Sequence, residues 1–154
     1  MISYSIDTAT TLCHNHGWPE ENIMLSTDCD KIARVAEACG LKTDYRRPPE
    51  LATDTAGSRE VMLHVADAAR AAGVEFDYIL LLQPTSPFRT IEDVDKCIAI
   101  YEKEQPDMAV TVKEASANPY YNCFETDPQT GTLHISKGDA LLTRRQDAPR
   151  AWEF

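Results

Sequence analysis

Residues 78–90 read YILLLQPTSPFRT, and this stretch decides the fold. Five apolar or aromatic residues, Tyr78 to Leu82, are followed at once by an amide, two prolines, two hydroxyls and an arginine. An unbroken apolar run of this length is typical of a strand buried on both faces, as in a parallel sheet. Pro84 and Pro87 cannot donate to a β-ladder, so they end the strand. Because open α/β sheets bind ligands beyond the carboxyl ends of their strands, the stretch predicts both an α/β fold and a binding loop.

Strands and helices alternate on both sides of this stretch. Further strands are predicted at residues 23–25 and 108–112, which are largely apolar, and residues 41–45 are the remaining strand candidate. Apolar residues at helical spacing predict helices over residues 2–13, 31–39, 58–72 and 91–104. This order is typical of βαβ units, whose right-handed crossovers place helices on both faces of a mostly parallel sheet. We therefore expect a three-layer, Rossmann-like α/β core.

Glycines and short polar residues mark the ends of the predicted helices. Gly17, Gly40 and Gly73 each follow a helical pattern and are suited to end it. Asp28 or Asp30 is suited to cap the helix over residues 31–39.

The pattern changes towards the end of the sequence. From Asn118 onward short strands and turns replace the alternation, with a turn predicted at residues 127–131. We expect residues 1–115 to form the core, and residues 116–154 to form a hairpin-like arm that is not an independent domain.

Composition excludes several classes of protein. The 154 residues carry a net charge of −10, which argues against nonspecific binding to nucleic acid because that requires basic patches. Apolar residues make up 43% of the sequence, enough for a core, yet no run approaches the length of a membrane span. Five cysteines without a C-x-x-C pair predict reduced thiols in a cytoplasmic protein.

The first candidate site is the loop over residues 45–58. Arg46 and Arg47 offer planar, bidentate contacts to a phosphate, a carboxylate or a base edge. Ala56, Gly57 and Ser58 lead into a helix, where backbone N–H groups can approach a phosphate or ribose closely. The alternative is that Asp54 or Thr55 caps the helix and the arginines are solvated.

The second candidate site is the loop that follows Leu82. Gln83 can donate and accept, Thr85 and Ser86 offer hydroxyls, and Arg89 offers a fork of donors. These groups suit a polyhydroxylated molecule with a carboxylate. The alternative is a helix N-terminus at which the hydroxyls act only as local caps.

Other polar groups are weaker candidates. His14 and His16 resemble a metal-ligand pair, but they lie near a helix end without a third ligand. Asp28 and Asp30 suit a cap better than a metal. No Walker loop, G-x-G-x-x-G motif or Ser–His–Asp order is present, and we expect no metal ligand within these residues.

Four motifs in one order resemble a known family. The motifs are STD at residues 26–28, RRPPELATDTA at 46–56, LQPTSPFR at 82–89 and RRQDAP at 144–149. They resemble those of the acylneuraminate cytidylyltransferases, also called CMP-sialic acid synthetases, over nearly the whole chain. The QPTSP-x-R string is the most specific of the four. The resemblance implies a nucleotidyltransferase that joins CTP to a nine-carbon 2-keto sugar acid, giving a CMP-sugar and pyrophosphate with Mg²⁺.

The resemblance also implies roles for particular residues. The nucleotide would be bound by Arg47, Asp54, Ala56, Gly57 and Ser58, and the sugar acid by Gln83, Thr85, Ser86 and Arg89. Arg145 would lie on an arm that forms a homodimer and would reach the sugar carboxylate in the partner's site. No enzyme nucleophile is expected, because the hydroxyl of the sugar attacks phosphorus directly.

The sequence departs from the family pattern in three places. A basic phosphate loop is expected before the position of Met1, and an aspartate pair that binds Mg²⁺ is expected after Phe154. We therefore expect the metal ligands to lie outside these residues and this chain to be weakly active or inactive. Phe88 stands where leucine is common, and we expect it to face apolar surroundings.

The alternative function is a noncatalytic one. The chain would then be a remnant that binds a sugar acid or a nucleotide, or a scaffold that dimerises. A sheet without its first strand is expected to expose an edge, so we also expect poor solubility or self-association.

Overall fold

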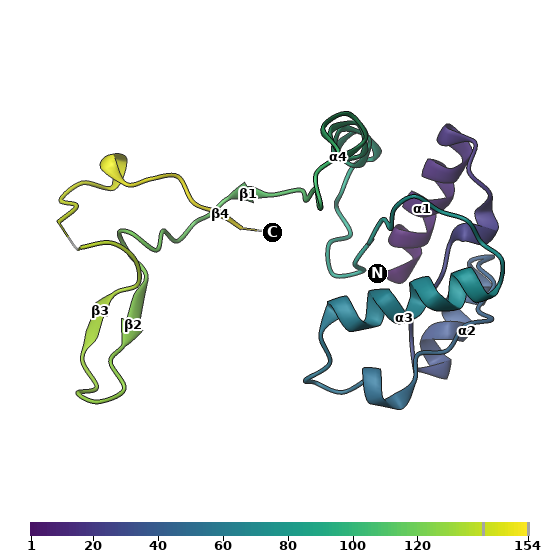
Figure 1. Cartoon of the computed structure of the whole chain (residues 1–154), viewed down its shortest axis with the longest axis horizontal. Helices are drawn as coiled ribbons and strands as arrows, with labels where there is room; N and C mark the ends of the chain where they lie inside the picture. The colour runs from purple at the N-terminus through teal and green to yellow at the C-terminus, as the bar shows by residue number, and fades with distance from the viewer. Residues whose placement is uncertain (140, 154) are drawn as a thin grey trace. The chain divides into compact units, whose positions relative to one another are not determined.

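The structure is a computed structural model that describes residues 1–139 and 141–153 (Figure 1). The chain divides into two compact units, Met1–Glu92 and Asp93–Phe154, which we describe separately. Elements of the first unit are α1 (Ile2–His16), η1 (Glu20–Asn22), α2 (Asp30–Ala38), η2 (Pro49–Leu51) and α3 (Ser58–Ala71). Next along the chain are α4 (Ile91–Glu104), β1 (Lys113–Glu114), β2 (Phe124–Thr126), β3 (Leu133–Ile135), η3 (Arg145–Asp147) and β4 (Trp152–Glu153).

The core of the first unit lies where α1 packs against α2. Ile6 and Leu12 of α1 are buried, and Leu12 is only 1% exposed. Ala33 and Ala36 of α2 are fully buried. These two alanines are three residues apart and therefore share one face of the helix, where their small side chains allow another element to approach closely.

The glycines predicted to end three helices are confirmed, and Gly73 follows α3 with φ 82°. Gly17 adopts the left-handed conformation (φ 68°) and its N–H donates to the carbonyl of Cys13, so α1 ends there, three residues later than predicted. Gly40 follows α2 with φ 90°, a conformation that glycine adopts without strain. Helix α4 has the predicted bounds.

The predicted cap of α2 is wrong. Cys29, not Asp28 or Asp30, occupies the N-cap position, and its side chain makes no capping hydrogen bond. Instead, the N–H of Cys29 donates to Oγ1 of the buried Thr27 at 3.1 Å. The hydroxyl of Thr27 therefore fixes the chain as it enters the helix.

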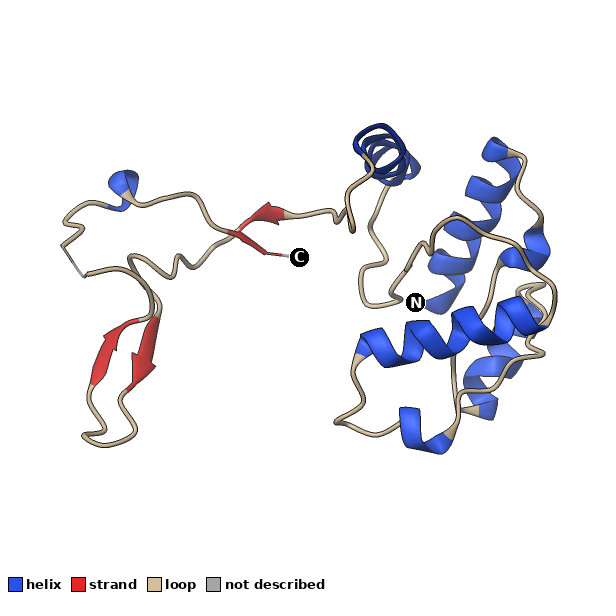
Figure 2. Cartoon of the chain, in the orientation of Figure 1, coloured by secondary structure: helices blue, strands red, loops and turns tan. Residues whose placement is uncertain are grey.

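The predicted parallel sheet is not formed by the described residues. Their strands make two antiparallel pairs, β1 with β4 and β2 with β3, and both pairs belong to the second unit (Figure 2). The four segments predicted to be strands, residues 23–25, 41–45, 78–82 and 108–112, do not form strands. These segments are not strands because a strand requires a ladder of hydrogen bonds to a neighbouring strand. Just beyond two of these segments, the N–H of Arg47 donates to the carbonyl of Thr27 at 3.0 Å.

The apolar run over residues 78–82 is not buried on both faces, contrary to expectation. Ile79 and Leu81 are 48% and 51% exposed, and Leu80 is also exposed. In the second unit Met108, Val110 and Val112 are exposed as well. Exposed apolar side chains favour association where they form a large patch.

A β-hairpin forms within the predicted arm. Strands β2 and β3 pair with Phe124 opposite Ile135, Glu125 opposite His134 and Thr126 opposite Leu133. The predicted turn joins them: Oδ1 of Asp127 accepts hydrogen bonds from the N–H groups of Gln129 and Thr130 at 2.7 and 3.0 Å. These bonds hold the pKa of the Asp127 carboxyl below its ordinary value. The division at residue 115 and the role of the arm in dimerisation stay predictions.

A second antiparallel pair joins distant parts of the second unit. Lys113 lies opposite Glu153, and Nζ of the lysine lies 2.8 Å from Oε1 of the glutamate. The N–H of Ala115 donates to the carbonyl of Ala151 beside this pair. Across residues 1–139 and 141–153, the helices are too short or too polar to span a membrane.

The five cysteines are free thiols that differ in burial. Cys13 is buried, whereas Cys39 is exposed. Burial, and then the nearby carboxylate of Glu20, raise the pKa of the Cys13 thiol. Cys13 therefore carries less thiolate than an ordinary cysteine at any pH near neutral.

We expect iodoacetamide at pH 8 to modify Cys39 at least roughly tenfold faster than Cys13, because only the exposed thiolate reacts readily. Mass spectrometry of peptides from a time course measures both rates. In urea the two rates should converge. Equal rates in the folded chain would contradict the burial of Cys13.

Candidate functional site

The arginine loop, residues 45–58, is tied to the chain segment just before α2. Arg47 donates from Nε to Oγ of Ser26 at 3.0 Å and from Nη2 to the carbonyl of Ser26 at 2.6 Å. Its backbone N–H donates to the carbonyl of Thr27 at 3.0 Å. Arg47 is half-buried, so its guanidinium is held in place rather than freely solvated. The structure thereby joins two motifs, at residues 26–28 and 46–56, that are far apart in the sequence.

The end of this loop forms a turn that leads into α3. The N–H of Ala56 donates to the carbonyl of Thr53 at 3.1 Å, and the exposed Asp54 lies within this turn. Gly57 is the N-cap of α3, and no side chain caps the helix. The alternative that Asp54 or Thr55 caps α3 is therefore wrong. The first-turn N–H groups of a helix without a side-chain cap are suited to an anion.

One acidic side chain lies at this helix end. The carboxylate of Glu60 lies against Gly57, in the space that a Cβ would fill. A negative charge is favourable at the positive end of the helix dipole. An anionic ligand at this position would therefore have to displace the Glu60 side chain.

The glutamine loop, residues 83–89, is folded around one backbone carbonyl. The carbonyl of Gln83 accepts hydrogen bonds from Nη2 of Arg89 and from the N–H of Ser86. The side chains of Gln83, Thr85 and Ser86 are exposed. The loop thus brings four predicted sugar-acid residues together, with Arg89 crossing back to the start of the loop.

Arg89 has an incomplete set of partners. Nη1 is shielded from solvent and has no hydrogen-bond partner in the part of the chain that is described. Burial lowers the pKa of the Arg89 guanidinium, because desolvation disfavours the charged form. An arginine remains protonated at neutral pH in spite of such a shift. A carboxylate ligand would supply the acceptor that Nη1 lacks if the guanidinium turned towards solvent.

The sequence led us to expect Phe88 to face apolar surroundings, and this expectation is wrong. Its side chain is 94% exposed at a turn of the glutamine loop. The turn lies between Pro87 and Arg89, and the inward position is taken by Arg89, which folds towards the Gln83 carbonyl.

Arg145 lies in the second unit, at the start of η3. Its side chain is exposed. The neighbouring Arg144 makes a bidentate pair with Asp147, from Nε to Oδ2 at 2.8 Å and from Nη2 to Oδ1 at 2.7 Å. This pairing raises the pKa of Arg144 and rigidifies the turn that carries Arg145.

Two of the weaker candidates, Asp30 and His16, have other partners, and Oδ1 of Asp30 lies 3.7 Å from Nε of Arg46. His16 stacks on Trp18, with ring centroids 4.3 Å apart, and Trp18 meets Tyr78 edge-on at 6.2 Å. In the described residues no group of three or more His, Cys, Asp or Glu side chains is placed to hold a metal ion.

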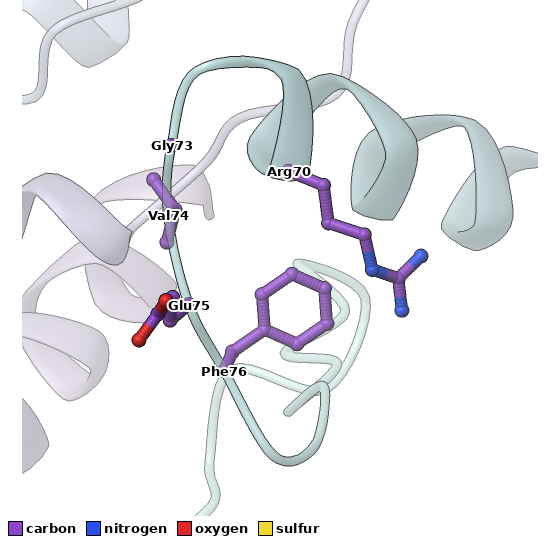
Figure 3. A pocket seen from close by; sticks show the side chains of 5 residues that line it. All are labelled: Arg70, Gly73, Val74, Glu75 and Phe76. Atoms are coloured by element: carbon purple, nitrogen blue, oxygen red, sulfur yellow. The ribbon is translucent and has the colours of Figure 1, made fainter.

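Sequence reasoning missed two features of the first unit. One is the pairing of Ser26 with Arg47, for which the only signal was the motif at residues 26–28. The other is a hollow of about 370 Å³ beyond the end of α3, lined by Arg70, Gly73, Val74, Glu75 and Phe76 (Figure 3). The guanidinium of Arg70 lies 4.9 Å from the centre of the Phe76 ring. No sequence pattern predicts this hollow.

The chain is similar to proteins of known activity. A family model described as "Cytidylyltransferase" matches residues 1–153. A "Post-translational flagellin modification protein B" of Campylobacter coli is 29% identical over all of this chain and 63% of its own length. A "CMP-N,N'-diacetyllegionaminic acid synthase" of Legionella pneumophila is 36% identical over 71% of this chain and 46% of its own length.

A third relative has a related name. An "N-acylneuraminate cytidylyltransferase" of Escherichia coli is 36% identical over 59% of this chain and 21% of its own length. The chain thus spans less than two thirds of the length of these relatives. The family model nevertheless covers nearly every residue, and the chain therefore belongs to the cytidylyltransferase family.

Proposed function

We propose that this chain carries the nucleotide loop and the sugar-acid loop of an enzyme that joins CTP to a nine-carbon 2-keto sugar acid. The observation that carries the proposal is the match of the cytidylyltransferase family over residues 1–153. Two relatives named for CMP-diacetyllegionaminic acid and N-acylneuraminate support a sialic-acid-like sugar as the second substrate. Sialic, legionaminic and pseudaminic acids all remain candidates within this class.

The nucleotide half of the site would be the arginine loop. Arg47 is held by Ser26 on one edge of its guanidinium, and the other edge is suited to a phosphate or a base edge. Asp54 and residues 56–58 lie at the start of α3, which has no side-chain cap. Backbone N–H groups at this helix end would approach the ribose or a phosphate.

The sugar-acid half would be the glutamine loop. Arg89 would donate to the carboxylate of the sugar once its guanidinium turns out of its shielded position. The exposed side chains of Gln83, Thr85 and Ser86 would hydrogen-bond the hydroxyl and acyl groups. Arg145 would contact the sugar carboxylate in the partner's site of a homodimer.

The reaction needs no nucleophile from the protein. The anomeric hydroxyl oxygen of the sugar acid attacks the α-phosphorus of CTP and forms a new P–O bond. The bond from that phosphorus to the bridging oxygen breaks, pyrophosphate leaves, and the hydroxyl proton passes to solvent. The protein's part is to position two anionic substrates and to neutralise charge.

Mg²⁺ is part of this proposal, and when bound it would neutralise charge on the triphosphate. The described residues contain no metal-binding group of side chains, so we assign no ligand among them. We also propose a three-layer core with a mostly parallel sheet, and a cytoplasmic location.

A noncatalytic function is the second candidate, because the chain spans at most 63% of the length of these relatives. It would bind a nucleotide or a sugar acid without joining them.

Calorimetry of the 154-residue chain tests the proposal. We expect CMP and N-acetylneuraminate to bind separately, each at one site per chain, and we expect no detectable CMP-sugar from CTP, sugar acid and Mg²⁺. Binding of neither ligand would contradict the proposal. Turnover by the chain would contradict the expected inactivity and exclude the noncatalytic alternative.

A further inference from the structure

Ser26 is the only residue whose side chain accepts a hydrogen bond from Arg47 in the described part of the chain. Its hydroxyl accepts from Nε at 3.0 Å, and its carbonyl accepts from Nη2 at 2.6 Å. Both acceptors thus come from one residue and lie along one edge of the guanidinium. Two hydrogen bonds along an edge fix the plane of the group, whereas a single bond leaves it free to rotate.

Ser26 is followed by a residue that is itself held in place. The next residue, Thr27, is buried, and its carbonyl accepts from the N–H of Arg47 at 3.0 Å. Its hydroxyl accepts from the N–H of Cys29 at 3.1 Å, at the start of α2. A chain of contacts therefore runs from α2 through Thr27 and Ser26 to the guanidinium of Arg47.

The opposite edge of the Arg47 guanidinium is available to bind a ligand. Within residues 1–139 and 141–153, Nη1 of Arg47 donates to no protein acceptor, and Nη2 has one further N–H. These donors form the end of the fork that binds phosphate, carboxylate or a base edge in a bidentate manner. A guanidinium that is fixed before binding loses less entropy when its ligand binds.

We propose that Ser26 is a positioning residue for nucleotide binding, because it sets the plane in which Arg47 presents its free edge to the cytidine nucleotide. This inference rests on the proposed function, since it assumes that Arg47 binds the nucleotide. Ser26 does not touch the ligand. Its hydroxyl acts through Arg47, which explains why a small hydroxyl residue stands at the end of the run over residues 23–25.

The first test needs no ligand. In the 154-residue chain we expect the Nε–H resonance of Arg47 to be shifted and protected from solvent exchange in NMR spectra. Ser26→Ala should remove the protection, and Ser26→Thr should keep it. An unprotected Nε–H in the unsubstituted chain would overturn the inference without affecting the proposed function.

The second test measures CMP binding by calorimetry. Ser26→Ala should weaken CMP binding about tenfold, the effect of one hydrogen bond to a charged group, and leave N-acetylneuraminate binding unchanged. Ser26→Thr should restore the affinity, because it retains the hydroxyl. Ser116→Ala, an exposed serine in the second unit, serves as the matched control.

Arg47→Lys separates the two possible failures. If Arg47→Lys weakens CMP binding while Ser26→Ala does not, the positioning role is wrong and the proposed function stands. If Arg47→Lys leaves CMP binding unchanged, Arg47 is not a nucleotide ligand and both fail. A positioning role further predicts that Ser26→Ala adds little once Arg47 is lysine, whereas a purely structural role predicts additive losses.

Discussion

Arg89→Ala should weaken the binding of N-acetylneuraminate by about 100-fold, in line with the loss of a shielded, charge-assisted hydrogen bond. The change removes the donor Nη1, which has no protein partner in the described residues, and the bond from Nη2 to the Gln83 carbonyl. Arg89→Lys should weaken binding less, because it retains the charge but loses the fork. Calorimetry with the sugar acid measures both variants.

Two controls make this result specific to the glutamine loop. Arg34→Ala removes an exposed arginine of α2 and should leave sugar-acid binding unchanged. Binding of CMP to the Arg89→Ala chain should also persist, because the arginine loop does not depend on Arg89. Undiminished sugar-acid binding by Arg89→Ala, or an equal loss of CMP binding, would contradict the assignment.

Leu12→Ala should lower the free energy of unfolding of the first unit by about 2–5 kcal/mol, the usual cost of removing a buried leucine side chain. Leu12 is 1% exposed in the core between α1 and α2, where a cavity would be left. Urea denaturation followed by the amide signals of α1 measures the loss.

Leu63→Ala is the matched comparison, since Leu63 lies on α3 of the same unit and is 45% exposed. Leu63→Ala should lower the free energy of unfolding much less than Leu12→Ala does. Equal costs for the two variants would mean that the helices of the first unit do not form the core described above.

The helices of this chain can be predicted from the sequence because their signals are local. Each of the four predicted helices is present, with ends within three residues of the prediction. Apolar spacing sets the face, and glycines such as Gly17 and Gly40 adopt the left-handed conformation that ends a helix. The cap of α2 was predicted wrongly because several hydroxyl and carboxylate residues near Cys29 suit the role equally well.

The parallel sheet cannot be established in the same way, because a strand depends on residues that are distant in sequence. The run over residues 78–82 has the composition of a buried strand, yet Ile79 and Leu81 are about half exposed and the run has no ladder. The β2–β3 hairpin shows the contrast. Its two strands are neighbours in sequence, so the turn at Asp127 predicts the pairing.

The positions of the two candidate loops could be predicted, whereas the binding roles of their residues stay predictions. Both loops occur where the sequence placed them, and Gln83 and Arg89 are in contact. The pairing of Ser26 with Arg47 was not predicted, because 21 residues separate them and serine is common in loops. The exposure of Phe88 was missed as well, since its neighbour Arg89 occupies the inward position.

Chemical-shift mapping by NMR on the 154-residue chain tests the central claim most directly. The claim is that the arginine loop binds the nucleotide and the glutamine loop binds the sugar acid. We predict that CMP shifts the amide signals of Arg47 and residues 54–58, and that N-acetylneuraminate shifts those of residues 83–89. The account would be contradicted if both ligands shifted only the amide signals of other residues. It would also be contradicted if neither ligand shifted any signal at millimolar concentration.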